Sequence, residues 1–213
     1  KDLSIGALAG VWATENSRSA IWDAMKRLET FATSGPRIKV RMFGGVGLSE
    51  PADPVAMAEE GYVLGTHMGG DLPSIGSAPT FTVYAEKDPD GATLDRIQII
   101  KVWVDMNGYV NEKIVDVVWS EDRKIDRRTG KLPPVGNTVD VSTAKFANDI
   151  GAPVLMGAWT DEDFDPQDHA FYYARAIEIP TPRWSTYDAV RSSSPLLDDV
   201  PATIQELGKA SRI

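Results

Sequence analysis

The sequence predicts a mainly β protein, an antiparallel β-sandwich of about seven strands that follows one amphipathic helix. Two observations support this fold class. From Thr80 onward, apolar residues recur at every second position in short runs bounded by turn residues, which is the pattern of half-buried strands. Before them, a single stretch near the beginning of the chain has apolar residues at helical spacing.

The first expected element is a helix over residues 18–30. Asn16 and Ser17 are both good N-cap residues. The apolar stripe of the helix consists of Ile21, Ala24, Met25, Leu28 and Phe31. Residues 33–36, Thr-Ser-Gly-Pro, should end it, because proline biases the residue before it away from helical backbone.

The strands are expected to begin at residues 38–43, where Ile38, Val40 and Met42 should face the core. Residues 46–78 are rich in Gly, Pro and Ser and should form a long surface excursion, with a helical turn at 54–60. The further strands are expected at 80–86, 95–105, 110–119, 137–141, 153–160 and 170–179. Asn107-Gly108 favours a type I′ hairpin turn between the second and third of these.

One motif makes the expected sandwich immunoglobulin-like. Asp168-His169-Ala170-Phe171-Tyr172 has the D-x-A-x-Y pattern of a tyrosine corner, in which a tyrosine hydroxyl bonds to upstream backbone. Tyr172 would then have a structural role, and a chance match is the alternative. After the prolines at 180 and 182, residues 202–207 are expected to form a short helix.

The composition is that of an ordinary globular protein, with 213 residues of which 42% are hydrophobic and 25% charged. A net charge of -9 without a basic stripe argues against nucleic acid and against docking on an anionic membrane. No apolar run approaches the roughly 20 residues of a membrane-spanning helix. The lack of an initiator Met and of a signal peptide predicts a processed or truncated product. The lack of cysteine fits a periplasmic or extracellular location, although cytoplasmic proteins can lack it too.

The sequence offers no catalytic or metal-binding constellation. His67 and His169 are its only histidines and lie far apart, whereas a catalytic zinc normally takes three protein ligands that usually include histidine. The acidic run at 161–168 alternates as calcium ligands do, but Pro166 stands where an EF-hand needs glycine, so we interpret it as a solvated loop. There is no G-x-S-x-G elbow and no phosphate-binding loop.

Three arginines are candidate ligand contacts. Arg18, Arg37 and Arg183 stand beside turn or helix-cap positions, where a planar guanidinium can hold a carboxylate or phosphate. The competing interpretation, which we favour, is that each ties down a loop by hydrogen bonding.

Several stretches of the chain resemble one bacterial family. They are Gly10–Ala13, Glu15–Arg18, Ala20–Met25, Arg27–Arg37, Met68–Pro73, Leu94–Lys101, Ala170–Arg175 and Glu178–Trp184. Through them the chain resembles the domain-of-unknown-function family 3604, a group of PHP-like (amidohydrolase-like) metal-dependent hydrolases, and it resembles only the C-terminal part of such proteins. Residues 207–213 lack the aromatic final strand of the family, which leaves the closure of one sheet edge unpredicted.

The resemblance implies an upstream α/β barrel that carries His and Asp ligands for a divalent metal. Those motifs are not in this chain, so no catalytic residue, metal ligand or cofactor can be assigned to it. It also implies three segments, namely 1–37 as a linker and the helix that closes the barrel, 38–190 as the sandwich, and 191–213 as a C-terminal tail.

The first functional hypothesis is a non-catalytic sandwich that packs on the barrel of a metal-dependent hydrolase and shapes its mouth. Glu15, Asn16, Arg18 and Arg37 would lie nearest the mouth, and the chain would be inactive alone. Without the barrel, the exposed helix face would favour self-association. The alternative is a stand-alone exported module that binds carbohydrate or protein, for which two or more aromatic residues should be exposed together on one face.

Overall fold

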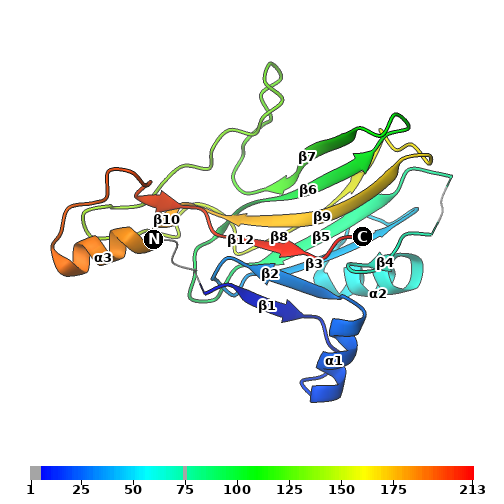
Figure 1. Cartoon of the computed structure of the whole chain (residues 1–213), viewed down its shortest axis with the longest axis horizontal. Coiled ribbons are helices and arrows are strands. Elements are labelled where there is room, and N and C mark those ends of the chain that lie inside the picture. Colours follow the sequence, from blue (N-terminus) through cyan, green and yellow to red (C-terminus); the bar gives the residue numbers. More distant parts are fainter. Residues whose placement is uncertain (1–5, 74–75) are drawn as a thin grey trace.

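Two antiparallel sheets face each other and enclose the core (Figure 1). The computed structural model describes residues 6–73 and 76–213. Its larger sheet contains, in spatial order, β1 (Leu8–Val11), β2 (Thr30–Thr33), β12 (Leu207–Ala210), β9 (His169–Glu178), β6 (Leu94–Val104) and β7 (Val110–Trp119). Its smaller sheet contains β4 (Thr66–His67), β3 (Lys39–Gly45), β5 (Thr80–Glu86) and β8 (Val154–Thr160). The predicted mainly β, antiparallel sandwich is confirmed.

The remaining described elements lie around the two sheets (Figure 1). They are helices α1 (Arg18–Lys26), α2 (Pro54–Leu64) and α3 (Trp184–Ser192), and a two-stranded ribbon of β10 (Thr181–Pro182) and β11 (Thr203–Ile204). The sequence did not predict α3. The helical turn expected at 54–60 is a longer helix, α2, and Asp53 caps its start by accepting from the backbone N–H groups of Val55 and Ala56 at 2.8 and 2.9 Å.

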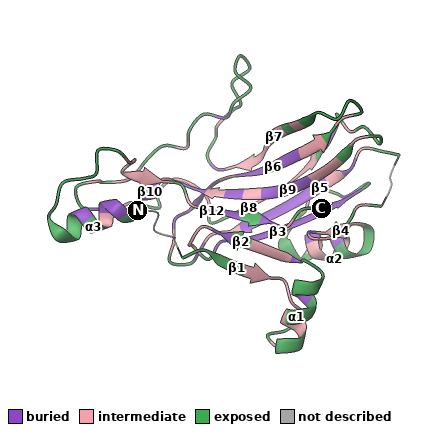
Figure 2. Ribbon diagram, viewed as in Figure 1, coloured by how far each residue is buried: buried purple, intermediate pink, exposed green. Residues whose placement is uncertain are grey.

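The core lies between the facing sides of the sheets. Ile38, Val40 and Met42 are fully buried, as predicted, and they belong to one apolar cluster with Ile97 and Ile99 of β6. Figure 2 shows that burial is concentrated on the central strands of both sheets. Complete burial of one such side chain stabilises the fold by about 1.5–3 kcal/mol.

The hairpin predicted between β6 and β7 is present, with Val104 opposite Val110. Its turn is not the predicted type I′, because Gly108 (φ 82°) has a positive φ and Asn107 does not. The Asp105 carboxylate instead accepts from the backbone N–H groups of Asn107 and Tyr109, at 2.9 Å each, and so closes a longer loop.

Helix α1 begins where the sequence predicts and ends earlier. The Ser17 hydroxyl accepts from the backbone N–H of Ala20 at 3.3 Å and caps the first turn. The helix ends at Lys26 rather than residue 30, because Leu28 adopts a left-handed conformation (φ 56°) that turns the chain into β2. Phe31, expected on the helical stripe, is therefore a strand residue.

The C-terminal region differs most from the prediction. Residues 137–141 form no strand and contribute only an isolated bridge between Asp140 and Lys145. Residues 202–207 are not a helix, because β11 begins at Thr203. The chain then enters the larger sheet as β12, which pairs with β2 on one side and β9 on the other. Parts of the three expected segments 1–37, 38–190 and 191–213 therefore share one sheet.

A buried ion pair replaces the expected tyrosine corner. The Lys101 ammonium lies 2.6 Å from the Asp161 carboxylate, and both side chains are at most 2% exposed. The Tyr172 hydroxyl donates to the same carboxylate oxygen at 2.7 Å, not to upstream backbone. Burial and then this acceptor raise the pKa of Tyr172, which keeps the hydroxyl protonated as a donor. The interpretation of residues 161–168 as a solvated loop is wrong for Asp161, which is fully buried.

Helix α2 packs closely on the outer face of the smaller sheet at Gly61. A Cβ at this position would lie 2.3 Å from Cγ of Phe43, whose ring is fully buried. Only glycine allows this approach without a shift of the helix or of the ring.

We therefore expect Gly61→Ala to destabilise the protein by about 1–2 kcal/mol, because the overlap outweighs the gain in helix propensity. Urea unfolding followed by circular dichroism measures the change. Val63→Ala on the same helix is the control, since Val63 is 79% exposed and its loss should change stability by less than about 0.5 kcal/mol. An unchanged or higher stability of Gly61→Ala would contradict this packing.

A buried carboxyl group lies at the end of β9. Glu178 is 1% exposed, and its Oε1 has no hydrogen-bond partner within the described chain. Burial, followed by the nearby carboxylates of Glu206 and Asp88, raises the pKa of Glu178 to about 8, which Lys87 partly opposes. The ordinary pKa of 4.5 applies to the unfolded chain. Between these values the folded protein holds a proton that the unfolded chain has released.

This difference predicts that the contribution of Glu178 to the free energy of unfolding is greatest below pH 4.5 and falls as the pH rises toward 8. Glu178→Gln keeps a neutral side chain at every pH. Its free energy of unfolding relative to the unsubstituted protein should therefore increase from pH 5 to pH 8, by up to about 4 kcal/mol. Urea unfolding at several pH values measures the change, and parallel curves for the two proteins would show that Glu178 is not protonated in the fold.

Candidate functional site

The predicted site residues do not come together in one place. Glu15, Asn16 and Arg18 surround the start of α1, where the Glu15 carboxylate accepts from the Ser17 hydroxyl at 2.7 Å. Arg183 precedes α3, which lies at a different end of the molecule (Figure 1).

Arg37 ties a loop to the beginning of β3. Its guanidinium donates to Asp88 at 2.9 Å and to Asp90 at 2.5 Å, and its backbone N–H donates to Asp88 at 2.7 Å. Burial opposes the ionisation of Asp88, but the hydrogen bonds from the Arg37 side chain and from the backbone N–H groups of Arg37 and Asp90 outweigh it and lower the pKa of Asp88 to about 2. Arg183 has a different environment, since its Nε is buried and has no hydrogen-bond partner among the residues described.

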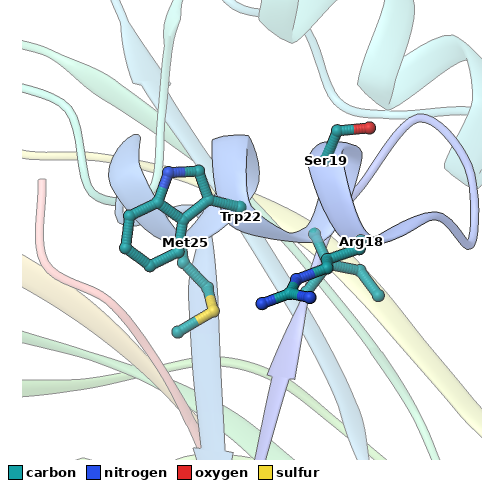
Figure 3. Close-up of a pocket in the computed structure, with 5 residues that line it drawn as sticks. Arg18, Ser19, Trp22 and Met25 are labelled. Atoms are coloured by element: carbon teal, nitrogen blue, oxygen red, sulfur yellow. The ribbon is translucent and has the colours of Figure 1, made fainter.

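One candidate surface is the outer face of α1, shown in Figure 3. A cavity of about 750 Å³ is lined there by Arg18, Ser19, Ile21, Trp22 and Met25. Trp22 and Met25 are 57% and 48% exposed, which is high for large apolar side chains. The figure shows the Trp22 ring next to Met25, with the Arg18 guanidinium turned toward them. We call this surface the α1 face.

A second candidate is a cavity of about 650 Å³ between α2, β3 and the segment that leads into α1. Its lining consists of Trp12, Ala13, Thr14, Arg27, Arg41, Ala58, Tyr62 and His67. We call it the Arg41 cavity, because the guanidinium of Arg41 lies among its aromatic walls.

The fold places Arg41 through the alternation of β3. Met42 points into the core, so its neighbours Arg41 and Phe43 lie on the opposite face, which α2 covers. The Arg41 guanidinium lies 4.4 Å from the Trp12 ring centroid and 5.2 Å from that of Tyr62. At the shorter distance the cation is attracted to the Trp12 ring face. Toward Tyr62, its Nη2 donates to the phenol oxygen at 2.7 Å. The Trp12 ring is fixed in turn, because its indole N–H donates to the Val40 carbonyl at 2.8 Å.

Glu29 joins the charged groups of the Arg41 cavity. Its carboxylate is 1% exposed, and one oxygen accepts from the Tyr62 hydroxyl and lies 3.6 Å from the Arg41 guanidinium. The other oxygen lies 3.4 Å from the Arg27 guanidinium. Burial and then the hydrogen bond to Glu29 raise the pKa of Tyr62, so the phenol remains a donor. Two guanidinium groups and one carboxylate leave a net positive charge of one.

His67 adds a directional group to the same cavity. Its Nδ1 lies 2.8 Å from the Met68 carbonyl oxygen, which can only accept, so Nδ1 carries a proton. In a neutral ring Nε2 is then a hydrogen-bond acceptor. Nε2 has no hydrogen-bond partner in the described part of the chain.

Sequence reasoning missed the Arg41 cavity. The alternation of residues 38–43 placed Arg41 opposite the core, but it gave no sign that a helix covers that face. The contact of Glu29 with Arg41 could not be predicted, because Glu29 was expected to lie within the helix. The only available signal was a charged residue between apolar neighbours on a strand.

Residues 6–73 and 76–213 contain no group of three His, Asp or Glu side chains that could hold a metal ion. No helix among them is long and apolar enough to cross a membrane.

Comparison with known proteins identifies the family. Residues 1–213 match the model of a family described as a protein of unknown function (DUF3604). The chain belongs to this family. No curated protein and no solved structure matches this DUF3604 chain.

We expect Glu29→Gln to destabilise this DUF3604 chain by about 3 kcal/mol, because it leaves the Arg41 cation largely buried without its carboxylate. Chemical unfolding measures the loss. Glu112→Gln is the matched control, since Glu112 is exposed on β7 and the same change should have little effect there. Equal stability of the two variants would show that Glu29 does not hold the cavity together.

Proposed function

We propose that this DUF3604 chain is a non-catalytic accessory sandwich that packs on the catalytic barrel of a metal-dependent hydrolase. The observation that carries the proposal is the α1 face, where large apolar side chains lie exposed. Exposed apolar surface of this kind marks contacts with other domains or proteins.

The apolar surface extends from α1 onto the edge of the larger sheet. A further cavity of about 680 Å³ lies between the helix and strands β1, β2 and β12, and Ile21, Met25 and Phe31 contribute to its walls. Strand β1 is the outermost strand there and pairs only with β2 within the described chain. A helix and a sheet edge that are apolar together favour a partner domain with a broad surface.

The resemblance to PHP-like hydrolases supports a barrel as that partner. In this proposal the barrel would hold a divalent metal through its own side chains, and that metal would supply an activated water for hydrolysis. The sandwich supplies no ligand and no cofactor. Glu15, Asn16 and Arg18 lie beside the α1 face and remain candidates for contacts at the barrel mouth. Arg37 is left out, because Asp88 and Asp90 already occupy its guanidinium.

The stand-alone module finds less support. The exposed aromatic residues lie on separate elements: Trp22 on α1, Tyr62 on α2, Tyr109 in the β6–β7 loop and Trp184 on α3. This distribution does not make a flat stacking platform for carbohydrate.

The test substitutes the α1 face in the full-length gene product. The double substitution Trp22→Glu and Met25→Glu should weaken the contact between barrel and sandwich by about 2 kcal/mol or more, because it puts charges where apolar side chains would be buried in that contact. Limited proteolysis should then cut between barrel and sandwich faster, and metal-dependent hydrolysis should fall. The isolated chain should keep its melting temperature, since both side chains are exposed in it.

Tyr109→Glu is the control, because Tyr109 is also exposed but lies on the β6–β7 loop. Equal behaviour of the control and the double variant would contradict docking through α1. Turnover by the isolated chain with stoichiometric metal would contradict its non-catalytic role.

A further inference from the structure

We propose that the Arg41 cavity binds a small hydroxy acid, with the ligand carboxylate at the two arginines and a ligand hydroxyl at His67. The proposal uses residues of this chain alone and does not depend on a catalytic barrel.

The arginines supply the charge for a carboxylate. Arg27 makes one ion-pair contact, at 3.4 Å to Glu29, and its side chain is 44% exposed, so most of its N–H donors face the cavity or solvent. The Arg41 side chain is 16% exposed, and its Nη2 already donates to the Tyr62 hydroxyl at 2.7 Å. Among the described residues its Nε and Nη1 have no hydrogen-bond partner, and they remain as donors for a ligand. Guanidinium groups bind carboxylates through paired N–H donors in one plane. The net charge of plus one matches a single carboxylate.

His67 determines which second polar group the ligand must carry beside its carboxylate. Since Nδ1 donates to the Met68 carbonyl, the neutral ring presents Nε2 as an acceptor. An acceptor beside two cations fits a hydroxyl group of the same ligand. An inorganic phosphate ion, whose oxygens are mainly acceptors at neutral pH, would meet this lone pair unfavourably.

The walls suit the carbon skeleton of such a ligand. Trp12, Tyr62 and Ala58 provide aromatic and apolar surface beside the polar groups. A volume of about 650 Å³ lies within the range of small-molecule sites, roughly 300–1,000 Å³. A sugar acid has the required carboxylate, hydroxyls and apolar ring face.

The experiment is isothermal titration calorimetry of the intact chain with D-glucuronate, D-glucose, acetate and inorganic phosphate. Glucuronate should bind one to one, at least about tenfold more tightly than each of the other three, because each of them lacks the carboxylate or the hydroxyl. Failure of glucuronate to bind at about 10 mM, or equal affinity for phosphate, would overturn the proposal.

Variants then locate the site. Arg27→Gln should weaken glucuronate binding by about tenfold or more, and His67→Phe should reduce the preference for glucuronate over acetate. Arg127→Gln, an exposed arginine on a distant loop, should leave binding unchanged. Melting temperatures without ligand check that each variant folds. Glucuronate binding that is unaffected by both cavity variants would show that the ligand does not occupy the Arg41 cavity.

The outcome is separate from that of the accessory-domain proposal. Trp22 and Met25 do not line the Arg41 cavity, so their substitution should leave glucuronate affinity unchanged in the isolated chain.

Discussion

The pairing of β12 between β2 and β9 is the constraint on which the N-terminal half of the larger sheet depends. It joins the antiparallel pair of β1 and β2, and with it α1, to the central strands through hydrogen bonds to both neighbours. Gly208 makes the close approach of the two sheets there feasible, because a Cβ would lie 2.8 Å from the Val40 side chain. The chain end reinforces this region, since Ile213 is buried and its backbone pairs with Tyr172 at 2.9 Å in both directions.

The Arg41 cavity follows from a strand that is buried on both faces. Met42 of β3 packs in the core between the sheets, and Phe43 packs under α2 on the opposite face. Arg41 lies on that covered face too, so its position alone removes it partly from water. A partly buried guanidinium needs an acceptor, and Glu29 supplies it from the turn after α1. The left-handed Leu28 is what brings Glu29 to that point. Fold and polar cluster therefore have a common origin in the short turn between α1 and β2.

The sequence carries strong local signals for some elements and none for others. Alternation of apolar residues predicted the bounds of β5 and β7 correctly, and Ser17 marked the start of α1. The end of α1 could not be predicted, because Leu28 and Phe31 continue the helical spacing while the backbone leaves the helix. Strand β12 has only four residues, and its place is decided by partners far away in sequence. The contact between Glu29 and Arg41 depends on the same long-range pairing and was equally hidden.

The overall charge limits how an anion could reach the Arg41 cavity. The chain carries a net charge of -9, so its long-range field repels anions. At physiological salt this repulsion is screened beyond roughly 8 Å, and contacts within the cavity decide the affinity. Arg41 is held between aromatic rings and Glu29, so little side-chain entropy is lost when a ligand binds it. Specificity must then come from short-range geometry, which is where the fixed Nδ1 proton of His67 and the planar guanidinium groups act.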